Sequence, residues 1–291
     1  GLWCVETWRA MGAPTNFVLA ELGPGRGTLM RDALRAARLA PEFVAAARLH
    51  LVEISPTLRD RQAAALADYA PCWHDRAEQL SDGPTILVAN EFLDALPVRQ
   101  CVRDEAGWHE RRVGVADEGF VFMLDPAIRA GAADAPLGAV RETCPEALAL
   151  ADWLGRRVAR QGGAALLIDY GYASGGFGDS LQALQAHRRA DVLTDPGDAD
   201  LTAHVDFAAI AARAEAAGAR TRGPVEQGRF LRTLGIDARA VCLMANASER
   251  DSLTIAAGHR RLVDPEAMGS LFKVVAIADP ALPPPAGFEE A

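Results

Sequence analysis

The chain has 291 residues, half of them hydrophobic, and a formal net charge of -9 at pH 7. This length and composition can bury the core of one large α/β domain with insertions. The negative charge argues against a nucleic-acid groove as the main surface. No apolar run approaches the length of a membrane span, so we predict a soluble protein.

The cysteines and histidines indicate in which cellular compartment the protein works and whether it binds a metal ion. The five cysteines are isolated and form no C-x-x-C pair, which favours a reducing, cytoplasmic compartment. The six histidines show no H-E-x-x-H or other metal-ligand spacing. We therefore predict no metal site, and we expect the cysteines to be small core residues.

A glycine-rich loop follows the first predicted strand. A helical pattern over residues 2–9 opens the chain, and an apolar strand from Phe17 then runs into Glu21-Leu-Gly-Pro-Gly-Arg-Gly-Thr28. Residues 29–38 have the pattern of a helix. Glycines allow positive φ and close approach of a ligand, and the start of a helix offers unpaired N–H groups. This loop is the first candidate binding site.

The spacing of the glycines narrows the choice of ligand. A dinucleotide fingerprint needs a sixth-position glycine, where this sequence has Thr28. The acidic-x-Gly-x-Gly-x-Gly pattern instead resembles motif I of the S-adenosylmethionine-dependent methyltransferases. This resemblance implies that the acid lies near the methionine end of the cofactor and that the glycines pass under it. The candidate contacts are Glu21, Gly23, Pro24, Gly25 and Gly27. The alternative is a glycine-rich turn without a ligand.

Two further acids follow the next predicted strands. Residues 48–53 read as a strand that ends in Glu53, and Ser55 then caps a helix that begins at Pro56. An acid at this position holds ribose hydroxyls in several kinds of nucleotide site. A short strand over residues 72–74 precedes Asp75. In methyltransferases a polar residue here often meets the adenine amino group. A surface Glu53 and a helix-capping Asp75 are the alternatives.

The second informative stretch is Asn90-Glu-Phe-Leu-Asp-Ala-Leu-Pro97, which follows a buried strand over residues 85–89. Ligands of open parallel sheets bind beyond the carboxyl ends of the strands, so Asn90, Glu91 and Asp94 should face the same crevice as the earlier acids. Two carboxylates beside a methyl donor indicate a cationic acceptor such as a guanidinium. Alternatively, Asp94 caps a following helix and Glu91 is solvated.

The rest of the chain reads as alternating elements and insertions. We predict a hairpin within residues 100–124, a helix over 145–160, a strand over 164–169, a long loop over 174–203 and a helix over 207–217. Strands over 219–222 and 271–278 are expected to form an antiparallel edge pair. We predict one domain over residues 1–278 with insertions at about 100–138 and 228–266, and a disordered Pro-rich tail over 279–291.

A set of motifs in order along the chain carries a family resemblance. Besides the two stretches above, they are Leu167-Ile-Asp-Tyr-Gly171, Gly178-Asp-Ser-Leu-Gln182, Asp200-Leu-Thr-Ala-His-Val-Asp-Phe207, Gln227-Gly-Arg-Phe-Leu231 and Met268-Gly-Ser-Leu-Phe-Lys273. Together they resemble the MidA-like methyltransferases, whose mitochondrial member is an assembly factor of respiratory complex I.

The resemblance implies a fold, a cofactor and a reaction. The expected fold is the α/β, Rossmann-type class I methyltransferase sheet, and the expected cofactor is S-adenosylmethionine. The mitochondrial member implies symmetric dimethylation of an arginine in a complex I core subunit, with Glu91 and Asp94 positioning the guanidinium here. The protein partner would be the corresponding NADH dehydrogenase subunit, in the bacterial cytoplasm for this chain and in the mitochondrial matrix for eukaryotic relatives.

One departure from the family pattern concerns the N-terminal side. Family members usually carry a Gly-Asp-Phe-x-Thr-Ser-Pro-Glu-like motif ahead of the residues equivalent to Gly1, and this sequence lacks it. Because that region packs over the cofactor side of the site, we expect weakened cofactor binding. Two other functions stay open: a non-catalytic, chaperone-like assembly factor with a vestigial cofactor site, and a small-molecule methyltransferase.

Overall fold

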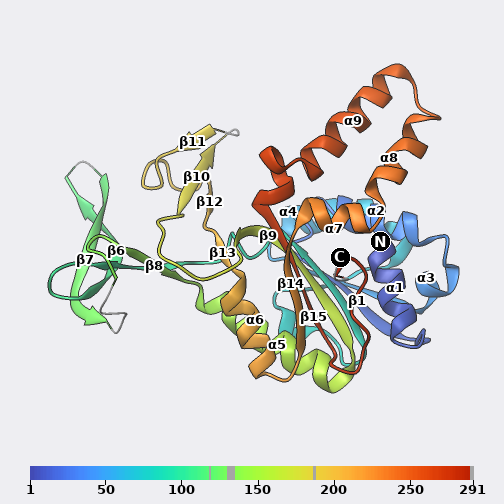
Figure 1. Cartoon of the computed structure of the whole chain (residues 1–291), viewed down its shortest axis with the longest axis horizontal. Coiled ribbons are helices and arrows are strands. Elements are labelled where there is room, and N and C mark those ends of the chain that lie inside the picture. The colour runs from blue at the N-terminus through green and yellow to red at the C-terminus, as the bar shows by residue number, and fades with distance from the viewer. Residues whose placement is uncertain (118, 130–134, 186–187, 289–291) are drawn as a thin grey trace.

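The computed structural model describes residues 1–117, 119–129, 135–185 and 188–288, which include a mostly parallel central sheet (Figure 1). Its order is β14-β15-β9-β4-β1-β2-β3, with β13 paired beside β9. The strands are β1 Phe17–Leu22, β2 Ala47–Val52, β3 Cys72–His74, β4 Thr85–Asn90, β9 Gly163–Tyr172, β13 Val205–Asp206, β14 Arg220–Glu226 and β15 Phe272–Ala278. Among these described strands, β15 pairs antiparallel with both β14 and β9, and the other pairs are parallel. The α/β class and the antiparallel edge pair are confirmed.

Helices cover both faces of this sheet. The helices of the described residues are α1 Leu2–Ala10, α2 Thr28–Ala37, α3 Pro41–Ala46, α4 Pro56–Ala65, α5 Pro145–Gln161, α6 Phe207–Ala216, α7 Gln227–Thr233, α8 Ile236–Met244 and α9 Glu249–Val263, with short turns at Ala67–Tyr69, Ala77–Gln79 and Pro265–Gly269. In β1, Phe17 packs in the core beside α1 to α3, and Val18 packs in the core beside α5 and α6. Strands buried on both faces explain why the strand sequences are apolar without alternation.

The predicted helix starts are confirmed by their caps. Ser55 Oγ accepts a hydrogen bond from the Leu58 N–H at 3.4 Å, and α4 begins at Pro56. Asp206 Oδ1 accepts from the Ala209 N–H at 3.0 Å at the start of α6. Each cap satisfies an N–H group that the first turn of a helix leaves unpaired.

Two groups of elements project from the central body (Figure 1). Strands β5 Arg99–Arg103, β6 Trp108–Ala116, β7 Gly119–Arg129 and β8 Val140–Thr143 form a separate antiparallel sheet in the order β7-β6-β5-β8. The predicted hairpin is β6 with β7, and β5 and β8 extend it beyond the prediction. Helices α8 and α9 form the second projection. Residues 118 and 130–134, which belong to the predicted insertion, lie outside the described residues.

The prediction of a long loop over residues 174–203 was wrong in its described part. Strands β10 Gln182–Gln185, β11 Arg188–Ala190 and β12 Asp200–Thr202 form a small antiparallel sheet in the order β11-β10-β12. Strands of three or four residues that are mostly exposed carry too few apolar positions to give a periodic signal.

The prediction of a disordered tail also fails for residues 279–288. Phe288 is 8% exposed, and its ring centroid lies 5.3 Å from that of Phe230 in α7. The Asp279 N–H donates to the Gly163 carbonyl at 2.9 Å. A single buried aromatic ring anchors a proline-rich segment whose backbone has little freedom to lose. Residues 289–291 lie outside the described residues. Within the described ranges, no helix has both the length and the apolar character that crossing a membrane requires.

Candidate functional site

The glycine loop between β1 and α2 adopts the backbone that the sequence predicts. Gly23, Gly25 and Gly27 have φ of +60°, +53° and +73°. A Cβ built on Gly23 would lie 2.9 Å from Cδ2 of Phe92, and one on Gly27 would lie 3.4 Å from the backbone of α4. Pro24 lies between the first two glycines. The loop therefore needs glycine for its conformation, and at Gly23 also for space.

Glu53 lies directly after β2, and its carboxylate is held in place. Oε1 accepts from the Ser55 N–H at 2.9 Å, and Oε2 accepts from Nε2 of Gln62 at 3.1 Å. Each carboxylate oxygen has a further lone pair to offer a ligand. Only 8% of Glu53 is exposed, so the carboxylate is fixed in orientation before any ligand arrives.

Gln62 of α4 connects three parts of this site, and sequence reasoning missed it. The side chain is fully buried and donates both to Glu53 and, at 2.8 Å, to the Gly25 carbonyl. Its Oε1 accepts from Nε1 of Trp73 at 2.8 Å. The glycine loop, the acid after β2 and strand β3 are thereby fastened together. A single glutamine in a polar helix carries no sequence signal for this role.

A cavity of about 300 Å³ opens between the glycine loop and the strand ends. It is lined by Gly23, Val52, Glu53, Ile54, Asp75, Arg76, Ala77, Glu78, Phe92, Leu96, Glu146 and Leu150. Asp75 does not cap the next short turn with its carboxylate. Its Oδ1 accepts from Nη2 of Arg59 at 2.7 Å, and the side chain is 67% exposed. The walls thus combine apolar side chains with fixed carboxylates.

The stretch after β4 places Asn90 and Glu91 at the carboxyl end of the sheet. Asn90 Nδ2 donates to Oε1 of Glu91 at 3.2 Å, and the Glu91 N–H donates to the Ile168 carbonyl at 2.9 Å. Glu91 is exposed and has φ of +50°. A non-glycine residue with positive φ is strained, and such residues concentrate at functional sites.

Asp94 lies in a buried network instead of at a helix start, since described residues 91–98 contain no helix. It is 6% exposed, and its Oδ2 accepts from the Tyr170 hydroxyl at 2.5 Å. Asp169 Oδ2 accepts from the backbone N–H groups of Leu93 and Asp94 at 3.0 and 3.1 Å. Burial, and secondly the charge of Asp94, raise the pKa of Asp169 to about 8. Burial also raises the pKa of Asp94.

Glu21 is a buried acid near the end of β1. It is 3% exposed, and its Oε2 has no hydrogen-bond partner among the described residues. Burial raises the pKa of this carboxyl to about 8. A buried oxygen without a partner costs free energy unless a ligand supplies a donor. Glu21 is therefore a further candidate for contact with a ligand, which could supply the missing hydrogen-bond donor.

A comparison with known families and proteins identifies the fold. A model of the S-adenosyl-L-methionine-dependent methyltransferases matches residues 1–225. The chain belongs to this methyltransferase family. The chain is similar to relatives named protein arginine methyltransferase NDUFAF7, mitochondrial, or its homolog. The relative from Drosophila melanogaster is 35% identical over 95% of this chain and 71% of its own length. The relative from Xenopus tropicalis is 33% identical over 100% of this chain and 76% of its own length.

A solved structure also matches the whole methyltransferase chain. It is a protein from Burkholderia thailandensis bound to S-adenosyl-homocysteine, with 30% sequence identity and a TM-score of 0.80. The match covers 99% of this chain and 76% of that one. The prediction of an S-adenosylmethionine-dependent methyltransferase is thereby confirmed, and the roles of the loop residues stay predictions.

Proposed function

We propose that this methyltransferase transfers a methyl group from S-adenosylmethionine to an arginine of a protein. The observation that carries the proposal is the similarity to relatives named protein arginine methyltransferases, which extends over at least 95% of the chain in Drosophila melanogaster and Homo sapiens. The exposed carboxylate of Glu91, at the end of β4, agrees with a cationic acceptor.

The residues around the cavity fit this cofactor. Glu53 offers fixed carboxylate lone pairs to the ribose hydroxyls, and Asp75 lies on the wall assigned to the adenine. We assign the floor of the cofactor site to the loop of Gly23, Pro24, Gly25 and Gly27, of which Gly23 lines the cavity. We assign the Glu21 oxygen that has no hydrogen-bond partner to the cofactor's ammonium group, which would favour the ionised carboxylate. We assign Asn90 to the same site because it holds Glu91 at the strand end. When bound, S-adenosylmethionine supplies a methyl group on a positively charged sulfur.

Glu91 and Asp94 have different parts in the proposed chemistry. Glu91 is exposed, so its carboxylate can accept two N–H bonds from a guanidinium and fix the nitrogen that receives the methyl group. The nitrogen must lose a proton around the transfer, and the Glu91 carboxylate can accept that proton as a general base. Asp94 is buried against Tyr170, so we assign it to positioning this segment and not to open contact with substrate.

The proposed partner is a core subunit of NADH dehydrogenase, with symmetric dimethylation of one arginine, in the bacterial cytoplasm. The relatives are named as mitochondrial protein arginine methyltransferases. A protein acceptor is supported by the projecting sheet, where β6 and β7 expose apolar side chains. Among them, Val113 is 58% exposed and Val115 81%, and in the antiparallel register they lie opposite the exposed Phe122 and Phe120. Contiguous exposed apolar side chains are typical of protein-binding surfaces.

The same apolar surface supports a second candidate, an assembly factor that binds a subunit without methylating it. The two functions differ in a single measurable quantity, the methylation of arginine in the bound subunit. A subunit that binds, with no mass gain on any arginine in the presence of S-adenosylmethionine, would favour the second candidate.

Replacing Glu91 with glutamine tests the arginine reaction. We expect the Glu91→Gln variant to methylate the NADH dehydrogenase core subunit about 100-fold more slowly, because the neutral amide neither pairs with the guanidinium nor favours its deprotonation. Transfer is measured by mass spectrometry of arginine-containing peptides, and cofactor affinity by calorimetry. Affinity should stay within about threefold, since the proposed contact is to the acceptor.

The matched control is Glu42→Gln, which removes an exposed carboxylate from α3. This variant should methylate the subunit at the wild-type rate. If Glu91→Gln does the same while it binds cofactor normally, Glu91 does not position the acceptor.

A further inference from the structure

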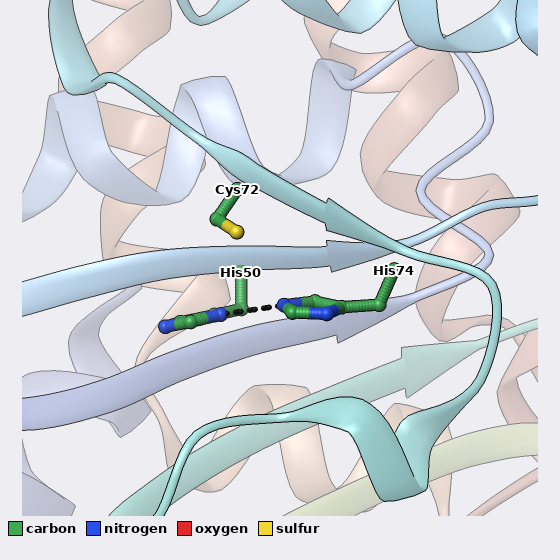
Figure 2. Close-up of side chains that lie close together, drawn as sticks. All are labelled: His50, Cys72 and His74. Atoms are coloured by element: carbon green, nitrogen blue, oxygen red, sulfur yellow. Dashed lines mark hydrogen bonds between the residues drawn. The ribbon is translucent and has the colours of Figure 1, made fainter.

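Two histidines and a cysteine converge on the edge strand β3 and its neighbour β2 in the central sheet (Figure 2). His50 lies on β2, and Cys72 and His74 lie on β3. In the parallel register His50 is opposite Cys72, and Val52 is opposite His74. Residues two apart on a strand share a face, so all three side chains lie on the same side of the sheet. Their ligand atoms lie within 4.8 Å of one another.

We propose that His50 Nδ1, Cys72 Sγ and His74 Nε2 bind a Zn²⁺ ion on this face. Zinc takes imidazole and thiolate ligands, and three protein ligands with water in the fourth position are a known arrangement. Hard cations such as Mg²⁺ and Ca²⁺ are disfavoured, because the cluster offers nitrogen and sulfur where those ions need oxygen. The inference is independent of the proposed methyl transfer.

The two rings present facing nitrogens to one another. His50 Nδ1 and His74 Nε2 are 2.8 Å apart, the ring planes differ by 17°, and the ring centroids are 5.1 Å apart. In a tetrahedral zinc site, ligand nitrogens about 2.0–2.1 Å from the metal lie about 3.4 Å from each other. On binding, the nitrogens therefore separate by a fraction of an ångström, and the rings turn so that both lone pairs point at the metal. Cys72 is exposed, so its side chain can rotate to complete the site.

Ser81 favours the tautomer of His50 that carries its proton on Nε2. The Ser81 hydroxyl lies 3.3 Å from His50 Nε2, and it accepts from Nη1 of Arg48 at 3.2 Å. When His50 carries its proton on Nε2, it can donate to this hydroxyl, and the Nδ1 lone pair then faces the metal. Ligand histidines in metal sites are commonly oriented by such a bond from the other ring nitrogen. His74 must carry its proton on Nδ1 for the same reason.

Neighbouring arginines place positive charge near the two histidines, and this charge limits the affinity of the cluster for a cation. Burial, and secondly the charges of His74, Arg48 and Arg157, lower the pKa of His50 to about 4. Burial and Arg59 lower the pKa of His74, against the opposing effect of Asp75. The Cys72 thiol releases one proton to solvent on binding, and its thiolate offsets one charge of the ion.

A bound ion would join β3 to β2 at the edge of the sheet. His74 directly precedes Asp75, which lines the 300 Å³ cavity. The metal would therefore stiffen the short strand that leads to one wall of the candidate cofactor site.

Titration of the metal-free protein with Zn²⁺ and Co²⁺ tests the site. We expect one Zn²⁺ per chain with a dissociation constant of about 10 µM or lower, and a Co²⁺ complex with a near-ultraviolet thiolate-to-metal absorption band. Cys72→Ser should remove that band and weaken Zn²⁺ binding by about 100-fold or more. Zn²⁺ should raise the Tm of the wild type and not that of Cys72→Ser.

The matched control is Cys242→Ser, which removes the other exposed cysteine among the described residues. It should bind both metals as the wild type does. Because Cys72 is exposed, its serine variant should fold, and His74→Gln provides a second loss of one ligand. Absence of Zn²⁺ binding by the wild type, or a thiolate band that persists in Cys72→Ser, would overturn the proposal.

Discussion

Replacing Glu53 with alanine is expected to lower the affinity for S-adenosylmethionine by about 100-fold, because two charge-assisted hydrogen bonds at about 1.5–3 kcal/mol each are at risk. The carboxylate is held by Ser55 and Gln62, so it meets the ribose hydroxyls without reorganising. Calorimetric titration of the folded variant with the cofactor measures the loss.

The control for this prediction is Glu78→Ala, which removes another carboxylate from the wall of the same cavity. Glu78 has no assigned contact to the cofactor, so affinity should change by less than about threefold. Glu53→Gln separates binding from folding, because the amide can still receive the bond from Ser55. Wild-type affinity in both Glu53 variants would remove Glu53 from the cofactor site.

The second large effect concerns Glu21 and is a dependence of stability on pH. The folded protein holds the pKa of Glu21 at about 8, above the ordinary value of 4.5 for this group. The neutral form is therefore favoured by folding, and this contribution is complete below the unfolded pKa and lost as pH rises through the folded one. Between pH 5 and pH 8, the free energy of unfolding of the wild type should fall by about 3 kcal/mol relative to Glu21→Gln.

Urea unfolding of the ligand-free protein at pH 5, 6.5 and 8 measures this difference. The difference between the wild type and Glu21→Gln cancels the contributions of other titrating groups to the free energy of unfolding. These groups include Asp169, whose pKa is also raised. Glu6→Gln, at an exposed acid of α1, should follow the wild-type pH profile. If Glu21→Gln and the wild type lose stability in parallel, Glu21 is not held neutral in the folded protein.

Much of the fold could be predicted because strong local signals agree with it. The apolar run before Gly23 predicts a buried parallel strand, and the three glycines predict positive φ, as the structure has them. Ser55 with Pro56 predicts the start of α4, and Asp206 predicts that of α6. In each case the chemistry of one or two neighbouring residues determines the local backbone.

The missed features depend on contacts between distant segments. Gln62 acquires its role only when α4 packs across the glycine loop. His50 and Cys72 are brought together by the register of β2 with β3. Because they are far apart in the sequence, no short spacing motif predicts the cluster. Phe288 becomes a core residue only because α7 presents Phe230 to it. Sequence patterns report local structure well, and these tertiary contacts leave no periodic trace.

The most direct test of the central claim is a calorimetric titration of the protein with S-adenosylmethionine and, separately, with NADH. The glycine loop without a sixth-position glycine and the fixed Glu53 predict saturable binding of S-adenosylmethionine at one site per chain and none of NADH. Binding of NADH with no binding of S-adenosylmethionine would contradict the assignment of this site to a methyl donor.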